Sequence, residues 1–220
     1  MIEHLLHLVL ASQLENQLTP QNPADYYWGA VVPDIRYLTG MPRSATHIPF
    51  DRIRVYFPVY PQLDSFIKGY LVHCLLDDID LNKVFARKLA FRLVQKRVPA
   101  QFAPVLLEFY YLDKTPVRVK LSGAFNEILG ELGIRPEHTT AFAAYLTTFL
   151  AAPSFESAAV VLKNLGLLGD QRVEKYLGTA KSIQKSRLLK QLLFAGMNFP
   201  QLNDLFVTYV ISSYSHEKQK

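Results

Sequence analysis

The sequence predicts an all-α protein, a single multi-helix bundle with an ordered proline- and aromatic-rich loop at residues 20–61. Three observations predict this class. Apolar residues recur at helical spacing along the 220-residue chain, strand-like alternation and Asn-Gly or Asp-Gly turns are lacking, and prolines and glycines separate the periodic stretches. Because half of the residues are apolar and 20% are charged, the composition is that of a globular core and excludes a disordered chain.

Helical periodicity predicts nine helices, and their expected ranges are 2–17, 62–80, 81–97, 100–112, 119–132, 136–151, 155–168, 171–194 and 200–215. Prolines such as Pro136 lie where a helix can begin, and glycines such as Gly133 lie where one can end. We expect one domain over residues 1–220, with a metal-site half at about 1–115 and a helical cap at about 116–220.

Residues 20–61 differ from the rest of the chain. They hold seven of its 13 prolines, a spacing through which no regular helix can run. They are also rich in aromatic residues, from Tyr26, Tyr27 and Trp28 to Tyr60. This composition predicts an ordered irregular segment pinned to the helical body, and ordered long loops are often functional.

The net charge of +5 comes from the C-terminal quarter, where residues 171–220 carry eight basic and three acidic side chains. Such a segment can contact an anionic membrane peripherally, but a solvated helix face is the favoured explanation because the charges are spread through a helical pattern. Nucleic acid is not an expected partner. Cys74 is the single cysteine, so no intramolecular disulfide can form. The N-terminus has no basic region and no small-residue cleavage site, and we therefore expect a cytoplasmic protein.

The chemistry-bearing residues gather before position 80. His73 and Asp77 are four residues apart in a nearly uncharged helical stretch, so both lie on one face of a buried helix. A buried carboxylate is costly unless it is paired, and a divalent cation would neutralise it. A His–Asp hydrogen bond in the core would satisfy the same two groups, and for this pair alone that explanation is at least as good.

Two further candidate ligands lie in proline-punctuated turns. Asp34 follows Pro33, which fixes the backbone just before the carboxylate, and His47 lies in the sequence Ala-Thr-His-Ile-Pro. Each residue taken alone also fits a bland role: Asp34 a cap, His47 a surface histidine.

Taken together, the order of these motifs resembles the zinc-dependent phospholipase C family and the related single-strand-specific zinc nucleases. The resemblance covers about residues 4–80, and the stretches that carry it are HLVLA (7–11), WGAVVPDIR (28–36), TH (46–47) and FIKGYLVHCLLDD (66–78). It implies an all-helical fold built around a cluster of metal ions, usually zinc.

Carried over residue by residue, the resemblance implies one metal site formed by Asp34, His47, His73 and Asp77, with Asp77 and His7 reaching a second ion. His4, one turn before His7, is the alternative to His7. The family's further ligands, which end in an HxxxE pair, have no counterpart in this sequence. One four-ligand site and a weaker second one are therefore expected, holding one or two ions. The mixed nitrogen and oxygen donors suit Zn, Fe or Mn.

The function that the resemblance implies is metal-dependent hydrolysis of a phosphodiester or a phospholipid head group, with Arg36 and Arg43 as candidate phosphate contacts. A different class remains open: a non-catalytic helical protein with a structural or vestigial metal site and a basic partner-binding surface. A phosphohydrolase of the HD type is disfavoured because the sequence has no His-Asp dipeptide.

Overall fold

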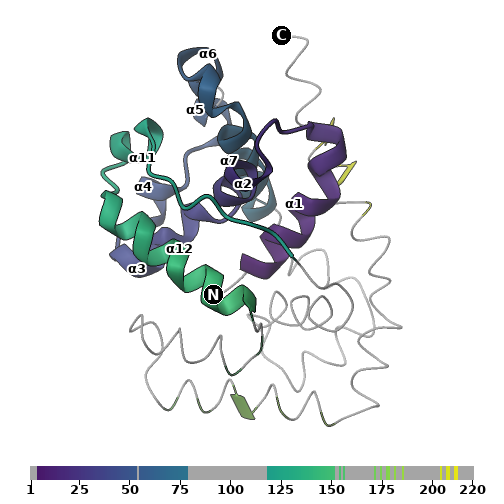
Figure 1. Ribbon diagram of the computed structural model, residues 1–220, viewed down its shortest axis with the longest axis vertical. Helices are drawn as coiled ribbons and strands as arrows, with labels where there is room; N and C mark the ends of the chain where they lie inside the picture. The colour runs from purple at the N-terminus through teal and green to yellow at the C-terminus, as the bar shows by residue number, and fades with distance from the viewer. Residues whose placement is uncertain are drawn as a thin grey trace.

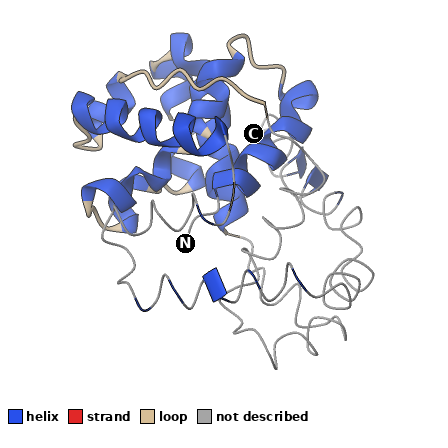
Figure 2. Ribbon diagram, turned by 60° about the horizontal axis from the view of Figure 1, so that its bottom comes forward, coloured by secondary structure: helices blue, strands red, loops and turns tan. Residues whose placement is uncertain are grey.

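The computed structural model describes residues 4–53, 55–78 and 118–151, with isolated positions between 154 and 212. Within these ranges every regular element is a helix or a 3₁₀ turn, and the helices pack as a bundle (Figure 2). The predicted all-α class is confirmed. None of the helices described is long and apolar enough to cross a membrane. The predicted helices at 81–97, 100–112, 155–168, 171–194 and 200–215 lie wholly or mostly outside the described residues.

Two long helices are largely buried and carry three of the histidines, and both were predicted. α1 (His4–Leu18) buries ten of its 15 residues, and α7 (Asp64–Asp77) buries eleven of 14 (Figure 1). Each is apolar nearly all round, which is the pattern of a helix surrounded by protein. The histidines in these helices therefore lie in the core: His4, His7 and His73 are each at most 2% exposed.

A close crossing fixes α2 (Pro23–Gly29) against α7. A Cβ atom at Gly29 would lie 2.1 Å from the Phe66 carbonyl oxygen, and one at Gly69 would lie 1.9 Å from the Tyr26 carbonyl oxygen. No side chain can occupy either position without moving backbone, so two glycines set the distance between the helices. This contact brings the backbone that follows α2 within reach of the side chains on the C-terminal half of α7.

The proline-rich segment is ordered and consists of single turns, as expected. After α2 it forms η1 (Val32–Ile35), α3 (Arg36–Thr39), α4 (Arg43–Thr46), α5 (Phe50–Ile53), α6 (Tyr56–Val59) and η2 (Pro61–Leu63). Pro23, Pro33 and Pro61 lie in the first turns of α2, η1 and η2, where a missing N–H costs nothing. No helix in this segment exceeds seven residues.

The predicted helix at 119–132 is wrong over most of its length. Only α11 (Glu127–Glu131) is helical, and residues 118–126 run as an extended strap across α2 (Figure 1). The Ala124 carbonyl accepts a hydrogen bond from Trp28 Nε1 at 2.9 Å, and Ser122 N–H donates to the Ala24 carbonyl at 3.1 Å. Gly123 has a positive φ of 64°, which a helix cannot accommodate.

α12 (Pro136–Ala151) has the predicted bounds. Its Phe142 ring lies 5.9 Å from the Trp28 ring and 5.5 Å from the His4 ring, measured between centroids. α12 therefore covers the end of α1 at which the histidines lie.

Candidate metal centre

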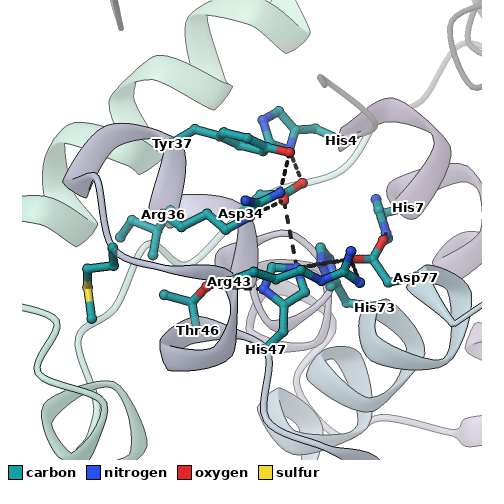
Figure 3. Close-up of polar contacts among 12 residues, drawn as sticks. His4, His7, Asp34, Arg36, Tyr37, Arg43, Thr46, His47, His73 and Asp77 are labelled. Carbon is teal, nitrogen blue, oxygen red and sulfur yellow. Dashed lines mark hydrogen bonds and ion pairs between the residues drawn. The ribbon is translucent and has the colours of Figure 1, made fainter. Parts of the chain in front are cut away.

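Six histidine and aspartate side chains converge between α1, η1, the end of α4 and α7 (Figure 3). They include all five residues that the sequence resemblance assigns as ligands, together with the alternative histidine: His4, His7, Asp34, His47, His73 and Asp77. Segments up to 73 residues apart in the chain thus supply a single buried polar cluster.

His73 presents one nitrogen to this cluster. Its Nδ1 lies 2.8 Å from the Ala30 carbonyl oxygen. Because a carbonyl oxygen can only accept, Nδ1 carries the proton and Nε2 keeps its lone pair. Metal-ligating histidines usually donate the N–H of their other ring nitrogen to a backbone carbonyl, a carboxylate or water, which fixes the orientation of the ring. The α2–α7 crossing that positions Ala30 therefore also sets the His73 tautomer.

Three ligand atoms lie close together around His73 Nε2. His47 Nε2 is 3.1 Å from it, Asp77 Oδ2 is 3.6 Å from it, and His47 Nε2 and Asp77 Oδ2 are 2.9 Å apart. In a tetrahedral site with metal–ligand bonds of about 2.0–2.2 Å, neighbouring ligand atoms lie roughly 3.3–3.6 Å apart. The distance between His73 Nε2 and Asp77 Oδ2 lies within this range, and the two distances to His47 Nε2 are shorter than it.

Thr46 allows His47 to serve the site in either tautomer. Its hydroxyl oxygen lies 3.1 Å from His47 Nδ1, and a hydroxyl can both donate and accept. With the proton on Nε2, His47 donates to the lone pair of His73 Nε2 at 3.1 Å. With the proton on Nδ1, Nε2 is free to bind a cation without a new partner being needed.

Asp34 completes the set from η1. Its Oδ1 lies 4.0 Å from His47 Nε2, and its Oδ2 lies 3.1 Å from His4 Nδ1. One ligand atom from each of Asp34, His47 and His73 lies within 4.8 Å of the other two. The carboxylate therefore faces the cluster with one oxygen and His4 with the other.

His4 and His7, the two alternatives for the N-terminal ligand, contact different carboxylates. His7 Nε2 lies 3.3 Å from Asp77 Oδ1, and the His7 ring stacks on the His73 ring at 4.0 Å between centroids. His4 faces Asp34 instead. Both histidines therefore point into the cluster, each toward a different carboxylate.

Both carboxylates are held in the ionised form. Burial by itself would raise the pKa of Asp34, but the His4 hydrogen bond and the charges of neighbouring histidines outweigh it and keep the pKa below the usual range. At Asp77 burial, which would raise the pKa, is likewise outweighed by the contacts with His47 and His7, which lower it. Two buried anions favour a cation at this position.

His73 is held in the neutral form. Burial, and then the neighbouring His7, lower its pKa to about 4. A neutral imidazole is the form that binds a metal, so no proton has to be removed from His73 at neutral pH. The adjacent Cys74 is buried, which raises the pKa of its thiol and keeps it protonated, as expected for an inert core cysteine.

Two overlapping groups in the described chain could hold a metal ion: His7 with His73 and Asp77, and Asp34 with His47 and His73. Both use His73, whose single available nitrogen can bind one ion. Assigning it to the second group and adding Asp77 Oδ2, which lies 2.9 Å from His47 Nε2, gives the four residues that the resemblance assigns to one site. His7 Nε2 and Asp77 Oδ1 then remain for a weaker second ion.

Two arginines flank the carboxylates. Arg43 Nη2 donates to Asp77 Oδ2 at 2.8 Å, and Arg36 Nε lies 3.9 Å from Asp34 Oδ1. The pairing of Arg43 with Asp77 and of His4 with Asp34 was not predicted from the sequence. The available signals were spacings: His4 lies one turn before His7, and Arg43 lies one turn before His47.

No family model, no curated protein and no solved structure matches this chain.

Proposed function

We propose that this protein is a metal-dependent phosphoester hydrolase resembling the zinc-dependent phospholipase C family. The observation that carries the proposal is the convergence of His47, His73 and Asp77, with Asp34 Oδ1 4.0 Å from His47 Nε2, around a histidine nitrogen whose lone pair is fixed by the Ala30 carbonyl. The motif order along the chain supports the same assignment.

The donor set fits a first-row transition metal. Two imidazole nitrogens and two carboxylate oxygens suit Zn, Fe or Mn better than Mg or Ca, which prefer oxygen ligands alone. A divalent ion bound there supplies a Lewis acid for a phosphoryl oxygen and lowers the pKa of a bound water toward neutrality. The chain itself supplies the orientation: Ala30 aims His73, Thr46 aims His47, and His4 aims Asp34.

The test combines metal content, stability and turnover on the full chain. We expect purified protein to retain zinc, iron or manganese at one or two ions per chain and to lose thermal stability with a chelator. We also expect chelator-sensitive hydrolysis of bis(4-nitrophenyl) phosphate or of phosphatidylcholine vesicles. His138, on α12 and outside the cluster, provides the matched control. His73→Ala should abolish these properties, and His138→Ala should preserve them. A protein that binds none of these metals with the cluster intact would refute the proposal.

A structural metal site is the second candidate, and the number and burial of the ligands favour it. Four protein ligands on one zinc leave no open position, which is typical of structural sites. In this case chelation would lower the melting temperature while no phosphoester is hydrolysed. Anion binding beside Arg43, the exposed arginine next to Asp77, distinguishes the two functions, because a hydrolase has to bind an anionic substrate and a structural site does not.

A further inference from the structure

Both arginines beside the metal cluster carry the charge needed to bind a phosphoryl group, but their surroundings differ. Arg36 is engaged on three sides. Its Nη2 donates to the Tyr37 hydroxyl at 2.5 Å, its guanidinium carbon lies 4.1 Å from the centre of the Tyr37 ring, and its Nε faces Asp34. Its side chain is 23% exposed. The Arg36 side chain is thus packed on Tyr37 with its Nε directed toward Asp34.

Arg43 lies on the exposed side of the cluster. Its side chain is 51% exposed, whereas that of Asp77, to which it donates, is 13% exposed. The guanidinium therefore reaches from an exposed position to the largely buried carboxylate of Asp77 (Figure 3). A guanidinium carries five N–H donors in a planar fork, so a contact through Nη2 leaves donors for a second anion.

The backbone holds Arg43 in this position. Arg43 begins α4, and His47 follows the helix and donates its N–H to the Arg43 carbonyl at 2.8 Å. A candidate ligand and the arginine thus belong to one turn, and they share Asp77 Oδ2: His47 Nε2 lies 2.9 Å and Arg43 Nη2 2.8 Å from it. The Arg43 guanidinium therefore lies next to the candidate metal position, with the Asp77 carboxylate between them.

We propose that Arg43 binds an anionic oxygen of the substrate phosphoester and supplies the second positive charge of the site. This rests on the proposed function. Phosphoesterases with two metals clamp the phosphoryl group between two cations. With His73 assigned to the ion beside Asp34 and His47, the described chain offers two atoms, His7 Nε2 and Asp77 Oδ1, for a second ion. Arg43 donates to Asp77 beside this second position, so its guanidinium can supply the positive charge that a second metal ion would otherwise carry. The planar arrangement of its N–H donors favours a phosphate oxyanion.

The experiment measures inorganic phosphate binding to the zinc-loaded full chain by calorimetry, and phosphate inhibition of bis(4-nitrophenyl) phosphate hydrolysis. The variants are Arg43→Ala, Arg43→Lys and a matched control, Arg52→Ala, which removes an exposed arginine on α5. We expect Arg43→Ala to weaken phosphate binding about 10- to 100-fold, the range for a charge-assisted hydrogen bond. Arg43→Lys should recover part of the loss, and Arg52→Ala should have no effect.

Zinc binding separates this role from a structural one. Removing a cation beside the ligands should leave zinc affinity unchanged or higher. If Arg43→Ala loses zinc and phosphate together, Arg43 merely holds Asp77 in place and the inference fails. If zinc is bound and phosphate affinity is unchanged, the inference fails while the proposed function stands. If the unaltered protein binds no zinc, iron or manganese, both fail.

Discussion

The substitution Gly69→Ala tests how the fold positions the candidate metal centre. The added Cβ would lie 1.9 Å from the Tyr26 carbonyl oxygen, 2.8 Å from its carbon and 2.9 Å from the Ala30 nitrogen. All three are backbone atoms, so α2 and α7 must separate by about 1 Å or more to reach ordinary contact. Because Ala30 accepts the His73 hydrogen bond, the same movement breaks the contact that orients the ligand.

We expect two measurable effects of Gly69→Ala. Overpacking of this kind costs about 1–3 kcal/mol, against a gain of up to about 1 kcal/mol in helix propensity, so the free energy of unfolding should fall by about 1–2 kcal/mol. Zinc affinity should fall about 10- to 100-fold, as when an outer partner of a metal ligand is lost.

Urea denaturation and calorimetric zinc titration measure the two effects. Gly130→Ala is the matched control, because at this helical glycine the nearest atom to an added Cβ is the tip of the flexible Phe125 side chain, at 3.2 Å. The control should keep its zinc affinity and should lose no stability, with a gain of up to about 1 kcal/mol from helix propensity. If Gly69→Ala matches the unaltered protein in both measurements, the two-glycine crossing does not position His73.

Three further predictions concern the cluster itself. Asp77→Asn should reduce zinc affinity by on the order of 100-fold or more, because losing a ligand costs more than losing a residue that only supports a ligand. An unchanged affinity in calorimetry would exclude Asp77 as a ligand. His4→Ala should weaken zinc binding about 10- to 100-fold by freeing Asp34, with an unchanged circular dichroism spectrum; equal affinities would show that Asp34 needs no such support. In the metal-free protein, the pKa of His73 is about 4 when folded and about 6.5 when unfolded, so the unfolded state binds more protons and stability falls as the pH drops from 6.5 to 4, by up to about 3 kcal/mol. Urea denaturation across this range checks the slope, which His73→Gln should flatten; an unchanged slope would contradict a neutral buried His73.

The long helices could be predicted because their apolar pattern and their boundaries are local properties. The predicted ranges 2–17, 62–80 and 136–151 match α1, α7 and α12 to within a few residues. The failure at 119–132 has a tertiary cause. The strap is held by Trp28, about a hundred residues away in the chain, and by the positive φ of Gly123, and neither is visible in the periodicity of the segment.

In the candidate site, too, some features could be predicted from the sequence and others depend on tertiary structure. The ordered motifs nominated five residues that the structure brings together, since the resemblance carries spatial information that spacing alone lacks. The partners of those residues depend on how the segments fold over one another. The contacts of His4 with Asp34, of Arg43 with Asp77 and of His73 with Ala30 could not be predicted from spacing.

The central claim is that the cluster around His73 binds a metal, and a crystal of the full chain measured at the absorption edges of zinc, iron and manganese tests it most directly. We expect an anomalous peak within bonding distance of His73 Nε2, His47 Nε2 and the carboxylates of Asp34 and Asp77, with any second peak beside His7. Six intact side chains with no anomalous peak among them, in protein supplied with these metals, would contradict the account.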